Sequence, residues 1–119
     1  MILHLIENED WQKVKETEVY SPSSIKTEGF IHCSTFDQVE VIANLFFKES
    51  TSLKVLCIDT EKVHSKIVYE DTENFGQLFP HLYGPLNLDS VTKVIELLRD
   101  QNGRFIMPNE LKEMKNRTL

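Results

Sequence analysis

The apolar residues of this chain are concentrated in short runs bounded by Gly, Ser, Thr or charged residues, and this pattern most constrains the fold. Runs of this length are typical of β-strands. Between them, apolar side chains recur at spacings of three and four, which predicts helices over 7–17 and 35–47. We therefore expect an α+β fold with two or three helices. The predicted strands cover residues 1–6, 29–33, 53–59 and 66–70.

A length of 119 residues limits this pattern to one domain with a modest core. Residues 1–108 contain the predicted strands and helices, so we expect them to form the domain. Residues 109–119 are polar and follow Pro108, so we expect a frayed or helical tail there. Apolar residues make up 40% and charged residues 27% of the chain, values that are typical of a globular protein and not of a disordered one.

The first predicted strand is apolar except for His4. Strand alternation places Leu3 and Leu5 on one face, and Ile2, His4 and Ile6 on the other. His4 thus shares a face with apolar neighbours.

Two later segments are harder to assign. Residues 79–86 contain two prolines and a glycine, so we expect a strand end or a functional loop there and not a central strand. The spacing of apolar residues over 88–98 fits a helix, although its Val-rich composition also suits a strand.

Charge and cysteine content narrow the possible partners. The net charge of −6 argues against a general nucleic-acid binder, which needs clustered Lys and Arg. Backbone N–H groups with a few local cations could still hold a small anion. Cys33 and Cys57 do not form a disulfide framework. We find neither a signal peptide nor an apolar stretch long enough to span a bilayer, so we expect a cytoplasmic protein that does not contact a membrane.

Three of the four histidines, His4, His32 and His81, lie in short apolar contexts next to turn-forming residues. Each could be satisfied separately in the core, but an unpaired buried ring costs about 1–3 kcal/mol, and three such cases favour a shared site. A three-histidine zinc site is an alternative. The close ligand pair that usually marks a zinc site is missing, so we expect no metal. His64 lies in a polar connection and is expected at the surface.

The run from Phe79 to Leu86 also suggests a rigid loop that presents His81 and Tyr83 to a ligand, because both side chains fall on one face of an extended segment. Gly84 permits a positive φ or a close approach. Glu28 and Glu70 are the carboxylates nearest in sequence, and either could orient a histidine. If His32 and Cys33 share a strand, they point to opposite faces, so Cys33 is expected in the core and not as a nucleophile.

These residues strongly resemble the family called domain of unknown function 952, over nearly the whole chain from Met1 to about Pro108. Tyr69 stands where Trp would be expected, and Leu3 where Tyr is common. The residues that carry the resemblance are Leu3-His4, Trp11, Glu28-Gly29-Phe30-Ile31-His32-Cys33-Ser34, Gln38, Ala43-Asn44, Val68-Tyr69-Glu70 and Phe79-Pro80-His81-Leu82-Tyr83-Gly84-Pro85-Leu86.

The resemblance implies an ADP-ribosyltransferase-like fold, in which small antiparallel sheets surround a cleft. Enzymes of that fold bind NAD with a His or Arg on the first strand, matched by His4, and a Tyr or His on a later strand, matched by His32. Their third position is usually Glu. Here the late motif offers His81 and Tyr83, which resembles the RNA 2′-phosphotransferase branch. The resemblance also makes residues 91–97 a strand.

Three hypotheses follow: an enzyme acting on NAD or an ADP-ribosyl compound, a non-catalytic nucleotide-binding module, and a protein-interaction domain. In the first, His4 would hydrogen-bond a ribose hydroxyl, and His32 would lie against the nicotinamide or its ribose. His81 and Tyr83 would position the substrate or an attacking group, and Glu70 would stabilise positive charge on the sugar. Affinity for a phosphate-bearing ligand should rise as the pH falls from about 8 towards 6. The candidate catalytic residues are His4, His32, Glu70, His81 and Tyr83; the candidate ligand-binding residues are His4, Gly29, Phe30, His32, Ser34, His81, Tyr83 and Gly84.

Overall fold

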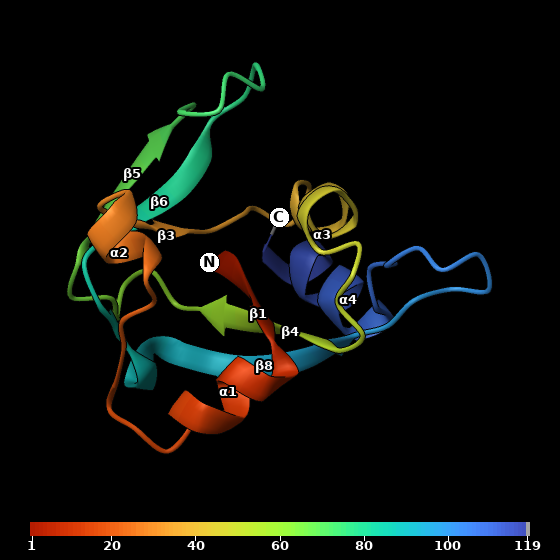
Figure 1. The fold of residues 1–119 in the computed structure, drawn as a ribbon, viewed down its shortest axis with the longest axis horizontal. Coiled ribbons are helices and arrows are strands. Elements are labelled where there is room, and N and C mark those ends of the chain that lie inside the picture. Colours follow the sequence, from red (N-terminus) through yellow and green to blue (C-terminus); the bar gives the residue numbers. More distant parts are fainter. Residues whose placement is uncertain (119) are drawn as a thin grey trace.

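The computed structural model describes residues 1–118 of the chain, an α+β arrangement of small antiparallel sheets (Figure 1). Its main sheet contains β1 (Ile2–Glu7), β4 (Leu53–Ile58) and β8 (Val91–Leu97), with β4 in the centre. The remaining elements are α1 (Asn8–Val14), β2 (Val19–Tyr20), α2 (Ser24–Thr27), β3 (Ile31–His32), α3 (Val39–Phe46), β5 (Lys66–Glu70), β6 (Phe79–Tyr83), β7 (Leu86–Asn87), the 3₁₀ turn Leu88–Ser90 and α4 (Asn109–Thr118).

The two faces of the main sheet pack against different layers, as alternation along the first strand predicts. Leu3 and Leu5 lie in a core cluster that also contains residues of α3 and α4. Ile2 and Ile6 lie in a second cluster, on the side of the sheet β3-β6-β5. Helix α1 packs Trp11 against this second cluster. Strands β1 and β4 are therefore covered on both faces, whereas most side chains of the edge strand β8 are exposed.

The prediction that residues 79–86 avoid the centre of a sheet is wrong, because β6 is the central strand of β3-β6-β5. Proline is tolerated there because β3 is very short. Pro80 lies opposite Cys33, just past the last β3–β6 residue pair, and its carbonyl accepts the Cys33 N–H at 3.0 Å. Only the one reciprocal hydrogen bond that proline cannot donate is lost.

The C-terminal segment is helical, one of the two states expected for it, and it also packs against the core. Residues Asn109–Thr118 form α4, which gives the described chain four helices where we expected two or three, and Leu119 lies outside the described residues. Leu111 is fully buried and Met114 nearly so, both in the core cluster with α3. Figure 1 shows α4 beside α3. A few apolar side chains at helical spacing are enough to anchor an otherwise polar helix.

Other boundaries move by a few residues. The predicted first helix ends at Val14, and the second strand is reduced to Ile31–His32. Residues Val91–Leu97 form strand β8, as the resemblance implies. Within residues 1–118, no helix combines the length and the apolar character that crossing a bilayer requires.

Candidate functional site

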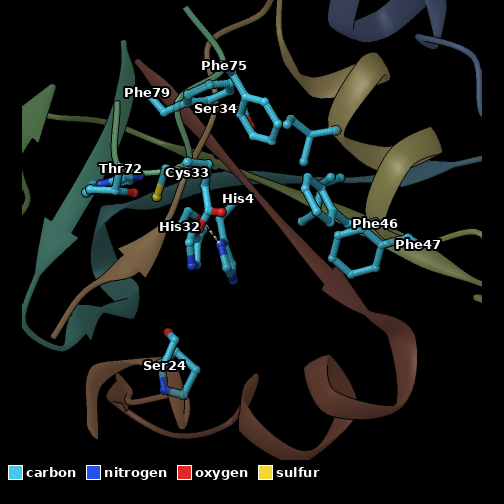
Figure 2. Close-up of a pocket in the computed structure, with 15 residues that line it drawn as sticks. His4, Ser24, His32, Cys33, Ser34, Phe46, Phe47, Thr72, Phe75 and Phe79 are labelled. Atoms are coloured by element: carbon cyan, nitrogen blue, oxygen red, sulfur yellow. Dashed lines mark hydrogen bonds between the residues drawn. The ribbon is translucent and has the colours of Figure 1, made fainter. Parts of the chain in front are cut away.

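A cavity of about 350 Å³ opens between the strands β1 and β3 and the helix α3 (Figure 2). One side carries polar groups from the strands, and the other side carries aromatic rings from the end of α3 and from the β5–β6 hairpin. The lining residues are His4, Leu5, Pro22, Ser24, His32, Cys33, Ser34, Ile42, Phe46, Phe47, Thr72, Glu73, Phe75, Phe79 and His81.

Three histidines reach this cavity from three strands. His32 on β3 pairs directly with His81 on β6, and their ring centroids lie 5.5 Å apart. Beyond β3 the chain bridges to β1 through paired backbone hydrogen bonds between Ser34 and Leu3. This bridge places His4 beside His32, whose carbonyl oxygen lies 2.6 Å from His4 Nδ1. Figure 2 shows the rings of His4 and His32 side by side in the cavity.

The protonation state of His4 follows from its partners. A carbonyl oxygen only accepts, so Nδ1 of His4 carries a proton and donates it to His32. Burial lowers the pKa of His4 to about 4, so the ring is neutral at pH 7. Nε2 is then a bare acceptor, and the hydroxyl of Tyr20 donates to it at 3.3 Å. His4 thus offers the cavity a hydrogen-bond acceptor and no positive charge.

His81 is held from two sides. Its Nδ1 lies 2.9 Å from Oε1 of Glu70 on the neighbouring strand, and its side chain is 4% exposed. The ring also stacks on Phe30, with centroids 4.0 Å apart and planes 13° apart. Because the strand register sets Val68 opposite His81, Glu70 reaches the imidazole diagonally across the strand pair.

Glu70 also accepts a short hydrogen bond from the Tyr83 hydroxyl. Hydrogen bonds from Tyr83 and then His81 hold the pKa of Glu70 below its ordinary value, whereas the bond to Glu70 raises the pKa of Tyr83. Glu70 is therefore ionised at neutral pH. Tyr83 is not among the described residues that line the cavity; its ring lies 5.3 Å from that of Phe30, and its hydroxyl is linked to His81 through Glu70.

His32 has its own carboxylate partner. Its Nε2 lies 2.9 Å from Oε2 of Glu28, and both side chains are close to half exposed. Such a pair, open to solvent, contributes little to stability. It orients the ring at the mouth of the cavity.

The other residues predicted for the site fall into two groups. Ser34 lines the cavity, and Phe30 supports His81 from behind. Gly29 and Gly84 are not among the lining residues; both have positive φ and shape turns. Burial raises the pKa of the Cys33 thiol to about 12, so this side chain is a protonated core residue, as expected.

The aromatic wall of the cavity, formed by Phe46, Phe47, Phe75 and Phe79, was not predicted from the sequence. The apolar spacing over 35–47 predicts a helix with one buried face, yet Phe46 at the end of α3 is 59% exposed. It lies 6.1 Å from Phe75, which lies 5.7 Å from Phe79 (ring centroids). One sequence feature points to this wall: three consecutive large apolar residues at 45–47 cannot all face the core from one helix.

Within residues 1–118, no group of three or more His, Cys, Asp or Glu side chains is arranged to hold a metal ion.

The fold and the site together define a small α+β domain with a cavity of small-molecule size. Residues 5–94 match the family described as protein of unknown function (DUF952), and the chain belongs to this family. No curated protein matches the sequence.

Solved structures of protein CC0527 from Caulobacter crescentus share the fold. Its crystal structure is 26% identical, covers 93% of this chain and 97% of that chain, and has a TM-score of 0.81. A crystal structure of its double mutant has a TM-score of 0.80 at the same identity and coverage. The solution structure is 27% identical over 87% of this chain and 89% of that chain, with a TM-score of 0.73.

Proposed function

We propose that the cavity binds NAD or an ADP-ribosyl compound through the nicotinamide–ribose end, in a fold of the ADP-ribosyltransferase type. The observation that carries this proposal is the convergence of His4, His32 and His81 on one side of a cavity with an aromatic wall. A planar base suits the aromatic side, and ribose hydroxyls suit the polar side. The motif positions of His4 and His32 support the same assignment.

The size of the cavity sets how much of the ligand enters. Ligand pockets span about 300–1,000 Å³, so a volume of about 350 Å³ accommodates a nucleoside-sized fragment and not a dinucleotide. The pyrophosphate and the adenosine would then lie outside the mouth of the cavity.

The polarity of the lining also suits the ribose better than the pyrophosphate. His4 Nε2 is an acceptor already bonded to a hydroxyl donor, so a ribose hydroxyl can replace the Tyr20 hydroxyl there. No Lys or Arg occurs among the described residues that line the cavity. His4 stays neutral between pH 8 and 6, so it cannot contribute to the predicted gain in phosphate affinity over that interval.

Calorimetric titration with NAD, ADP-ribose and nicotinamide tests this proposal. We expect NAD to bind more weakly than it binds a dedicated dehydrogenase. His4→Asn keeps a donor for the His32 carbonyl and removes the Nε2 acceptor, so it should weaken NAD binding about tenfold, the loss of one hydrogen bond. The exposed His64 supplies the control, because His64→Asn should leave the affinity unchanged. Absence of heat with all three ligands at millimolar concentration would overturn the proposal.

A protein-interaction domain is the second candidate. It is favoured by large apolar side chains exposed beside the cavity mouth, among them Phe46 and Phe75, with Leu78 58% exposed nearby. Exposed apolar groups of this kind often mark contact surfaces. If none of the three ligands binds, this candidate becomes the better one.

A further inference from the structure

In the cluster of His4, His32 and His81, the two ring nitrogens of His81 have different environments. Among the described residues, Nε2 of His81 has no hydrogen-bond partner, while Nδ1 is bonded to Glu70. Every fully buried side-chain nitrogen or oxygen among the described residues has a hydrogen-bond partner. Because Nε2 of His81 has none, it retains some exposure to solvent. His81 is only 3% exposed and lines the cavity, so we place the exposure of its Nε2 on the cavity side.

The tautomer of His81 is set by Glu70. The ionised carboxylate only accepts, so the proton of a neutral His81 lies on Nδ1 and the lone pair on Nε2. Stacking on Phe30 and pairing with Glu70 leave the ring little freedom to turn. Tyr83 donates to the same Oε1 atom of Glu70 and fixes the carboxylate in turn. The arrangement resembles the carboxylate–histidine pairs that activate a hydroxyl in many hydrolases.

We infer that His81 is the general base of this site, and that it takes a proton through Nε2 from a water molecule or an alcohol bound in the cavity. Glu70 acts as a positioning residue through Nδ1. The inference rests on the proposed function, because it assigns a reaction to the ligand proposed there.

The step balances for NAD and water. The water O–H proton moves to Nε2 of His81 while the oxygen forms a bond to C1′ of the nicotinamide ribose. The C1′–N bond breaks, and its electron pair leaves with nicotinamide, which departs neutral. The imidazolium then loses its proton to solvent, and the net products are ADP-ribose, nicotinamide and H⁺.

The test measures nicotinamide release from NAD by the full-length protein. His81→Asn keeps a donor to Glu70 and removes Nε2; we expect release to fall about 10²–10⁴-fold, a much larger loss than any change in the calorimetric affinity for NAD. In Glu70→Gln we expect a smaller loss that falls on kcat and leaves KM nearly unchanged, a split that a purely structural role would not produce. His64→Asn is the matched control.

The possible outcomes distinguish a failure of the general-base inference from a failure of the NAD-binding proposal. Binding of NAD without nicotinamide release by the wild-type protein would overturn the general base and leave the binding proposal standing. Equal release by wild type and a folded His81→Asn variant would do the same. If NAD does not bind, both fail. Should His81→Asn unfold in a thermal melt, the kinetics of Glu70→Gln decide: an unchanged kcat for nicotinamide release rejects the inference.

Discussion

At the scale of the residue, His4 shows how burial selects a chemical state. Its ring is 8% exposed and has a hydrogen-bond partner on each nitrogen. Burial disfavours the charged form more than the His32 carbonyl favours it, so the pKa falls to about 4 from 6.5. A histidine that sequence analysis expects to titrate near neutrality is thus a fixed neutral acceptor.

This shift predicts a pH-dependent stability. The folded pKa lies below the unfolded one, so between pH 6.5 and 4 the unfolded chain binds more protons, and stability falls as the pH falls through that interval. The full effect is about 3 kcal/mol. In urea titrations, the stability difference between wild type and His4→Asn should therefore shrink by this amount from pH 7 to pH 4. A difference that does not vary with pH would contradict the burial of a neutral ring, and His64→Asn should follow the wild-type curve.

At the scale of the element, the turn after β6 is set by close contact. Gly84 has a φ of +141°, and a Cβ built there would lie 2.6 Å from Oγ of Ser65. That hydroxyl donates to the Pro85 carbonyl at 2.7 Å, which ties the turn to the start of β5. Gly29 also has a positive φ, +91°, but nothing lies within 4 Å of the Cβ position. Both glycines have a positive φ, but only at Gly84 would an added Cβ meet a neighbouring side chain.

Alanine substitutions separate these two causes. We expect Gly29→Ala to cost about 1 kcal/mol for backbone strain alone, and Gly84→Ala about 2–3 kcal/mol because the clash with Ser65 is added. Chemical denaturation measures both values. In the background of Ser65→Ala, part of the Gly84→Ala cost should disappear. Equal costs at the two positions would show that the contact with Ser65 does not matter.

At the scale of the whole molecule, the fold is organised by a three-stranded sheet whose strands β1 and β4 are covered on both faces. One face packs against α3 and α4, and the other against the layer that carries His32 and His81. The cavity lies where α3 and that layer approach β1. The C-terminal helix supports α3, so it contributes to the shape of the site although it contains none of the lining residues.

Removing the contact between α4 and the core should be costly. Leu111 is fully buried, and we expect Leu111→Ala to lower the free energy of unfolding by about 2–5 kcal/mol. Lys112→Ala, at an exposed neighbouring position, should change it by less than about 0.5 kcal/mol. Thermal and urea unfolding give both numbers. Similar small effects at the two positions would indicate that α4 is dispensable.

Local pattern by itself determined much of this protein. The strand Lys66–Glu70, the two faces of β1 and the core position of Cys33 follow from alternation and composition, because side chains in a strand point to opposite faces wherever the strand lies. The two long motifs pointed to the family to which the chain belongs. These are properties of short segments, which do not depend on what packs against them.

The tertiary structure alone decided what depends on contacts between distant segments. Pro80 lies in a central strand because β3 ends opposite it, and Leu111 is buried because α3 lies across from α4. Phe46 and Phe75 are far apart in sequence but border one cavity. The neutral state of His4 and the open Nε2 of His81 likewise arise from burial and from partners on other strands. Sequence spacing cannot specify such environments, because they are set by the whole packed chain.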